Sequence, residues 1–167
     1  RKEVAEAALA LALAQAPTPA FESRTIGVGG ALSDTYARFE TLRGRANEAE
    51  LIALLEHESA VVRAYVGVHV ATKVPAGLLA LVALAEDDTP IATLRGCIGG
   101  GSSVSTLVVE ALCASPLEGA PKALLAIHAR GGAMAADALA CAAPFAGKQA
   151  STAAVEGLRA SPRPMQQ

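Results

Sequence analysis

Apolar residues along the chain recur every three to four positions, in segments of roughly ten to fourteen residues that proline, glycine and capping residues separate. Such spacing places the apolar side chains on one face of a helix. Strand-like alternation of apolar and polar positions is almost absent. The pattern therefore predicts an all-α protein.

Within that pattern the chain divides into four parts. Residues 1–15 form an alanine-rich N-terminal helix, and 16–32 an irregular loop with a short extended piece at Arg24 to Val28. A helical domain is expected over 33–160, followed by a polar, proline-containing tail at 161–167.

Capping residues, or a proline in the first turn, mark where the helices begin. The expected starts are Ser33, Asn47 with Glu50 as a capping box, Ser59, Pro75 and Thr89 followed by Pro90. Later helices are expected near 103–114, 121–130, 133–142 and 149–160.

A weak internal repeat appears when the chain is shifted by about thirty residues along itself. Residues 49–60 then align with residues 79–90, with leucines 51 and 54 matched by leucines 81 and 84. Each unit contains a helix, an acidic turn with a hydroxyl cap, and a second helix. This self-similarity favours stacked antiparallel helix pairs in a short, irregular α-solenoid.

The segment "LIALLEHESAVVRAYVGVHVA", residues 51–71, resembles a HEAT-type helical repeat of the phycobiliprotein-lyase-like group. A leucine-rich first helix, the turn acid Glu58 and the sequence Val62-Arg63-Ala64 carry the resemblance. In that family the arginine commonly meets acidic residues of its own or the next turn. The resemblance implies a HEAT-like fold in which Arg63 pairs with acidic turns and sets the stacking angle.

Five residues are candidates for binding a partner: Glu58, Arg63, Tyr65, Asp87 and Asp88. Tyrosine and arginine are common anchors in interfaces, and the acids would line one edge of a stack. In the competing interpretation, Tyr65 packs in the core, Arg63 forms an ion pair between repeats, and the acidic residues lie on a solvated face.

Composition narrows the classes of partner. Only 3% of residues are aromatic and the net charge is −2, with the basic residues scattered along the chain. A nucleic-acid partner is therefore not expected. The longest uncharged stretches, such as 74–85, are too short for a membrane span, which favours a soluble protein.

The stretch "RGCIGGGSSVS", Arg95 to Ser105, suggests a reactive or anion-binding loop. It matches neither a P-loop nor a nucleophile elbow. In the thirty-residue register Cys97 falls inside a helix as a small packing residue. Gly99 to Gly101 then end that helix, and Ser102 or Ser103 caps the next.

Catalytic chemistry has little support in the sequence. A nucleophilic cysteine would need a base such as His57, His69 or His128, whose places in space the sequence leaves open. Some HEAT-type enzymes hold two irons with several His-Glu dipeptides, whereas this chain has one, at His57 and Glu58. We therefore assign no catalytic residue, metal ligand or cofactor.

Two features of the sequence bear on the compartment. The three cysteines are far apart, odd in number and without a C-x-x-C pair, which favours a reducing, cytoplasmic location. Residues 1–20 resemble a secretory signal with a cleavage site at 14–16, although Glu6 interrupts the apolar run. Export is the alternative.

The function that the sequence favours is non-catalytic: a binding or scaffold module whose helical surface holds another protein. Two alternatives remain open. One is an enzyme or enzyme accessory, either chromophore-lyase-like or metal-dependent. The other is a structural subunit of a larger assembly, and self-association also stays open.

Overall fold

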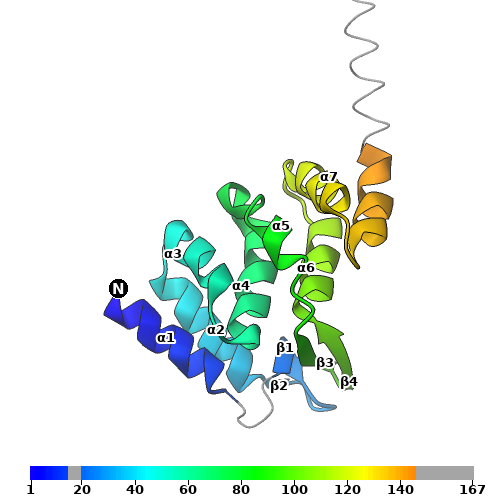
Figure 1. Cartoon of the computed structure of the whole chain (residues 1–167). Coiled ribbons are helices and arrows are strands. Elements are labelled where there is room, and N and C mark those ends of the chain that lie inside the picture. Colours follow the sequence, from blue (N-terminus) through cyan, green and yellow to red (C-terminus); the bar gives the residue numbers. More distant parts are fainter. Residues whose placement is uncertain (15–19, 146–167) are drawn as a thin grey trace, which may run out of the picture.

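The computed structural model describes residues 1–14 and 20–145, and shows a body of helices with a small sheet at one end (Figure 1). The expected helix at 149–160 and the tail at 161–167 lie outside the described residues. The helices are α1 (Lys2–Ala12), α2 (Asp34–Arg45), α3 (Glu48–Ala53), α4 (Ala60–Lys73), α5 (Leu81–Leu84), α6 (Val104–Cys113) and α7 (Ala120–Arg130), with 3-10 turns η1 (Leu54–Glu56) and η2 (Pro75–Gly77). Residues 135–145 are also helical. The strands are β1 (Ala20–Ile26), β2 (Ala31–Leu32), β3 (Pro90–Gly96) and β4 (Ile98–Ser103).

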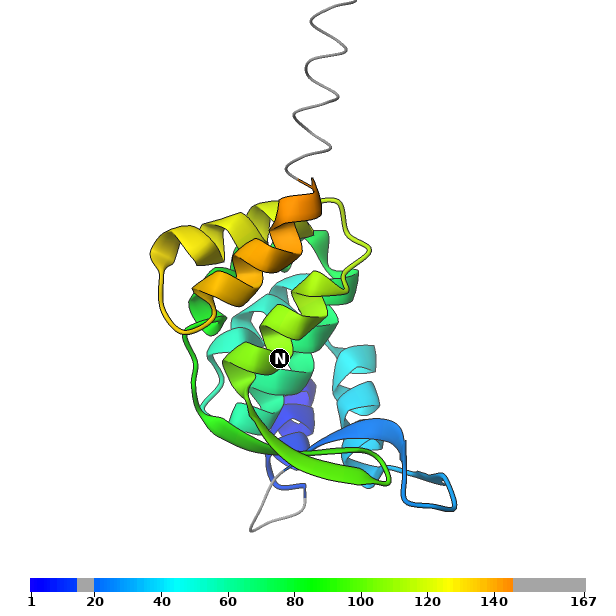
Figure 2. The same ribbon diagram turned by 90° about the vertical axis from the view of Figure 1, so that its right-hand side faces the viewer.

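The four strands form one mixed sheet in the order β2-β1-β3-β4. Strands β1 and β3 are parallel, and the two outer pairs are antiparallel. The prediction of an all-α fold, a short irregular α-solenoid of stacked antiparallel helix pairs like that of HEAT proteins, is therefore wrong. The fold is α/β, and Figure 2 shows the β3–β4 hairpin crossing below the helices.

Pairing between distant segments explains why the sheet escaped the sequence pattern. Phe21 of β1 lies opposite Thr93 of β3, and the Gly27 amide donates to the Gly96 carbonyl oxygen at 2.9 Å. Pro90, expected to open a helix with Thr89, is instead the first residue of a strand, where its missing N–H is tolerated. Strand formation here depends on a partner some seventy positions away, as the matched residues Phe21 and Thr93 show.

Three further predictions fail because these segments belong to the sheet. Residues 16–32 were expected to form a loop with one short extended piece at Arg24 to Val28. The described part of this segment instead contains two strands, β1 and β2. The thirty-residue repeat breaks down because β3 replaces the second helix of the second unit. Gly99 to Gly101 lie within β4 rather than ending a helix, and Cys97 is exposed in the turn between β3 and β4.

Most of the predicted helix caps are confirmed. The Ser33 hydroxyl accepts from the Tyr36 amide at 2.9 Å, and Asn47 forms the expected capping box with Glu50. Ser103 caps α6 by accepting from the Thr106 amide at 3.2 Å. Ser59 occupies the N-cap of α4 but makes no side-chain cap bond. Contacts within one helical turn are thus readable from sequence.

Helix α4 is the centre of the molecule. It packs against α1, α3, α5 and α6, and also contacts β1 and β3. A helix surrounded in this way must be apolar on nearly every face. Its buried residues are Val61, Val62, Ala64, Tyr65, Val66, Gly67, Val70 and Ala71.

Tyr65 joins α4 to the sheet. Its ring lies 4.6 Å from that of Phe21, 5.1 Å from that of Phe39 and 6.4 Å from that of Tyr36, measured between ring centroids. Its hydroxyl accepts from the Glu22 amide and donates to the Glu22 carbonyl oxygen, both at 2.8 Å. Four of the five aromatic side chains of the sequence therefore gather at one junction.

Candidate functional site

The five candidate residues divide into three groups in space. Glu58, Arg63 and Asp87 line one cleft between η1 and α5. Asp88 is exposed but does not line this cleft. Tyr65 is only 2% exposed and lies in the core, so its side chain offers no surface to a partner.

The cleft has a volume of about 510 Å³. Its floor, the buried side chains of Leu55 and Leu84, is apolar, and its rim carries the side chains of Glu56, His57 and Glu58. The lining residues are Ile52, Ala53, Leu55, Glu56, His57, Glu58, Arg63, Ala80, Ala83, Leu84 and Asp87.

Arg63 holds the two sides of the cleft together. Its Nε lies 2.7 Å from Oδ2 of Asp87, and the two side chains are 15% and 16% exposed. Its Nη1 donates to the carbonyl oxygens of His57 and Glu58 at 2.7 and 2.8 Å, and its Nη2 donates to the Thr89 hydroxyl at 3.2 Å. The family resemblance led us to expect a bond from Arg63 to an acid of its own turn, such as Glu58, or of the next turn; the structure pairs Arg63 with Asp87, in the next acidic turn.

Both carboxylate oxygens of Asp87 accept hydrogen bonds. Its Oδ1 accepts from the Thr89 amide at 3.1 Å and from the Thr89 hydroxyl at 2.5 Å. Burial acts to raise the pKa of this carboxyl, but the hydrogen bonds from Arg63 and Thr89 outweigh burial, so that the pKa is lowered. Asp87 is therefore charged at neutral pH and locked in place by its neighbours.

This arrangement predicts a loss of stability in acid. The pKa of Asp87 is lowered, and the pKa of Glu50 is lowered to about 2 by its bonds from the Arg1 side chain and the Asn47 amide. Both folded-state values lie below the ordinary values of roughly 4, so their contributions are present above about pH 4.5 and are lost as the pH falls toward 2. The free energy of unfolding in urea should change little between pH 7 and 4.5 from these two groups, and should fall between pH 4.5 and 2.5.

The Glu50→Gln variant serves as the control, because it should have a smaller loss between pH 4.5 and 2.5 than the unaltered chain. A free energy of unfolding that stays constant down to pH 2.5 would contradict the prediction. So would a loss confined to the range between pH 6 and 8, where these carboxyl groups do not titrate.

The rim of the cleft keeps two carboxylates available. Glu56 and Glu58 are exposed, and within the described part of the chain neither side chain is in an ion pair. Beside them the Ser59 amide donates to Nδ1 of His57 at 3.0 Å. In the neutral imidazole the proton then lies on Nε2, which can donate to a ligand.

The residues that a catalytic hypothesis would need are dispersed. His57 lines the cleft, whereas Cys97 does not. His69 is half-buried with its ring 5.8 Å from that of Phe39, and Nδ1 of His128 lies 3.1 Å from the Ala135 carbonyl oxygen. Across residues 1–14 and 20–145 no cluster of His, Cys, Asp or Glu is arranged to hold a metal ion.

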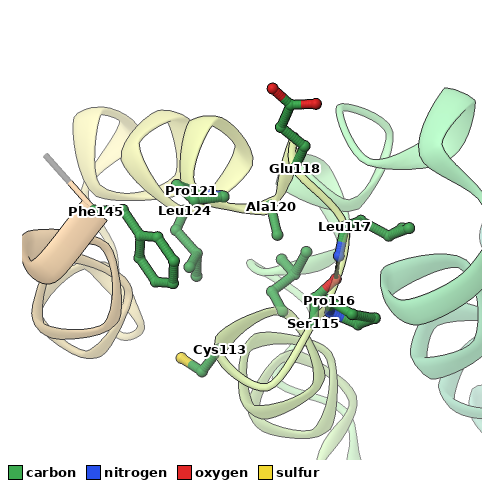
Figure 3. Close-up of a pocket in the computed structure, with 10 residues that line it drawn as sticks. Cys113, Ser115, Pro116, Leu117, Glu118, Ala120, Pro121, Leu124 and Phe145 are labelled. Carbon is green, nitrogen blue, oxygen red and sulfur yellow. Dashed lines mark hydrogen bonds between the residues drawn. The ribbon is translucent and has the colours of Figure 1, made fainter. Parts of the chain in front are cut away.

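A second pocket, of about 380 Å³, lies between α6, α7 and residues 135–145 (Figure 3). The sequence contained no signal for it, because its walls come from three separate segments; Cys113, which lines it, is disulfide-bonded to Cys141. The residues that shape it include Leu112, Cys113, Ser115, Ala120, Leu124 and Phe145. Cys97 is left as the free, exposed cysteine of the described residues.

No protein-family model matches the chain, and no curated protein or solved structure shows a significant match to it. These comparisons identify no HEAT-type repeat protein. In the described ranges, no helix is both long and apolar enough to cross a bilayer.

Proposed function

We propose that the protein is a binding module, and that the cleft between η1 and α5 takes a short segment of another protein. The segment carries one apolar side chain for the cleft floor and a lysine or arginine for its rim. The observation that supports this proposal is the combination of an apolar floor with the exposed carboxylates of Glu56 and Glu58.

Arg63 is an internal brace in this proposal rather than a contact residue. Its guanidinium already donates to Asp87, to two carbonyl oxygens and to Thr89. It therefore does not neutralise the rim carboxylates, which remain free to attract a cation. Charge complementarity of this kind selects partners and raises association rates more than it adds affinity.

The test begins with a displayed library of random twelve-residue peptides, selected on the immobilised full chain. We expect the selected peptides to combine a basic residue with an apolar one. A labelled synthetic copy of one selected peptide then gives a dissociation constant by fluorescence anisotropy. Removing one rim charge, by Glu56→Gln or by Glu58→Gln, should weaken binding by roughly 2–5-fold, the value of an exposed charge pair.

Two arginine substitutions form a matched pair. Ala83 is exposed on α5 and lines the cleft, so Ala83→Arg both fills the cleft and opposes a basic peptide; we expect binding to weaken by at least about tenfold. Ala5 is exposed on α1, and Ala5→Arg should leave binding unchanged. Selected peptides without a basic residue, or equal binding by the two variants, would refute the proposal.

We also infer that the protein works in an oxidising compartment, the exported alternative, rather than in the cytoplasm. The Cys113–Cys141 disulfide supports this inference, because structural disulfides persist in oxidising compartments. Fusing the full natural gene product to a reporter that is active only after export tests it. Activity confined to the cytoplasm would favour the original cytoplasmic prediction.

A further inference from the structure

The pocket between α6 and α7 is apolar inside. Leu112, Ala120 and Leu124 form its floor and are each at most 2% exposed. The ring of Phe145 lines the same pocket beside Leu124 and comes from the helix of residues 135–145, which we call the wall helix (Figure 3). The volume of about 380 Å³ falls at the small end of the range of roughly 300–1,000 Å³ that is typical of small-molecule sites.

Polar groups around the pocket are engaged or turned away. The Ser115 hydroxyl donates to the Ala71 carbonyl oxygen at 2.6 Å and accepts from the Leu117 amide at 3.1 Å. The carboxylate of Glu118 points away from the pocket interior in Figure 3. A charged ligand would therefore find no charged side chain turned toward it, which favours an uncharged, mainly apolar molecule as the occupant.

The wall helix is only lightly attached by apolar packing. Its fully buried side chains are two alanines, Ala138 and Ala142. Its large apolar side chains, Leu139 and Phe145, are 40% and 42% exposed. Because alanine buries little apolar area, the covalent bond between Cys113 and Cys141 is the strongest single link that holds Phe145 over the pocket floor.

We propose that the Cys113–Cys141 disulfide assembles this pocket, so that the oxidised protein binds a small, uncharged aromatic or aliphatic molecule and loses it on reduction. The pocket floor comes from α6 and α7, and the wall that the disulfide holds in place forms the opposite side of the pocket. Cavities lined by leucine and phenylalanine bind apolar molecules of matching size, and an aromatic ligand gains ring contacts with Phe145.

Reduction is a two-electron thiol–disulfide exchange with a dithiol. One thiolate of the dithiol attacks a sulfur of the Cys113–Cys141 bond, forms a mixed disulfide and releases the other cysteine as a thiolate. The second thiolate of the dithiol then closes its own disulfide and releases the second cysteine. Two protein thiols are formed, and the dithiol becomes a cyclic disulfide.

The test uses 1-fluoronaphthalene as the probe and 1-naphthoate as its charged counterpart, each titrated against the full chain. Fluorine NMR follows the first probe, and proton saturation transfer follows the second. We expect saturable binding of 1-fluoronaphthalene to the oxidised protein and at least tenfold weaker binding of 1-naphthoate. After treatment with dithiothreitol, binding of 1-fluoronaphthalene should also weaken at least tenfold, while circular dichroism still shows a folded chain.

Three variants keep the proposal falsifiable. Cys97→Ser removes the exposed thiol and should leave both binding and its loss on reduction unchanged. Phe145→Ala keeps the disulfide but removes the wall, and should weaken probe binding at least fivefold; Leu139→Ala, on the same helix but outside the pocket lining, should not. Absence of binding to the oxidised chain, equal binding after reduction, or equal effects of the last two variants would overturn the proposal. Because these readouts do not involve the peptide cleft, they are independent of the proposed function.

Discussion

Replacing Arg63 by methionine is expected to lower the free energy of unfolding by about 3 kcal/mol. The substitution keeps most of the aliphatic stem but removes the guanidinium, leaving Asp87 as a partly buried charge without its counter-ion. It also withdraws donors from the carbonyl oxygens of His57 and Glu58 and from the Thr89 hydroxyl. Urea denaturation at pH 7 followed by circular dichroism measures the change.

The matched control is Arg43→Met. Nη2 of Arg43 lies 2.8 Å from Oε2 of Glu40, but the two side chains are 43% and 39% exposed. Exposed pairs one helical turn apart contribute roughly 0.3–0.5 kcal/mol, so this control should barely change the free energy of unfolding. Similar losses from the two substitutions would show that Arg63 does not brace the cleft as its hydrogen bonds indicate.

A second large effect is expected at Gly67, where α4 lies against its neighbours. A Cβ atom at this position would lie 2.7 Å from Cγ2 of Val108 in α6 and 2.9 Å from Cδ2 of Leu84 in α5. Val108 is fully buried and has a stiff, branched side chain, so it cannot move aside. Gly67→Leu should therefore cost about 3 kcal/mol of stability, even after the gain of roughly 1 kcal/mol in helix propensity.

Gly44 provides the comparison, because it also lies in a helix, α2, but is exposed. A Cβ atom there meets nothing within 4 Å. Gly44→Leu should leave stability unchanged or raise it by up to about 0.5 kcal/mol. Thermal and urea unfolding of the two leucine variants should show changes in stability of opposite sign or of very different size. A small loss of stability in Gly67→Leu would contradict the close packing of α4 against α6.

The candidate cleft was only partly visible in the sequence. Glu58 lies in an acidic turn just before the helix that carries Arg63, and Asp87 lies in a second acidic turn. The sequence left open whether Arg63 meets an acid of its own turn or of the next turn, because both turns carry acidic residues at equivalent positions of the thirty-residue register. Because η1 and α5 line the same cleft, the guanidinium reaches Asp87, which follows α5.

The disulfide and the pocket beside it were not predictable at all. Cys113 and Cys141 are separated by 28 positions, and no sequence motif links them. The two cysteines lie within bonding distance only because α6, α7 and the wall helix fold back on one another. Cys97, which drew attention because glycines follow it, lies apart in the hairpin turn as the unpaired cysteine.

By itself the sequence determined the features that depend on neighbours within one helical turn: the caps at Ser33, Asn47 and Ser103, and the apolar faces of the helices. Tertiary structure alone decided the β1–β3 pairing, the choice of Asp87 as the partner of Arg63, and the Cys113–Cys141 link. The reason is physical. A cap or a helix face is stabilised by groups three or four positions away, whereas a strand, an ion pair or a disulfide gains its energy from a partner that only the folded chain brings near.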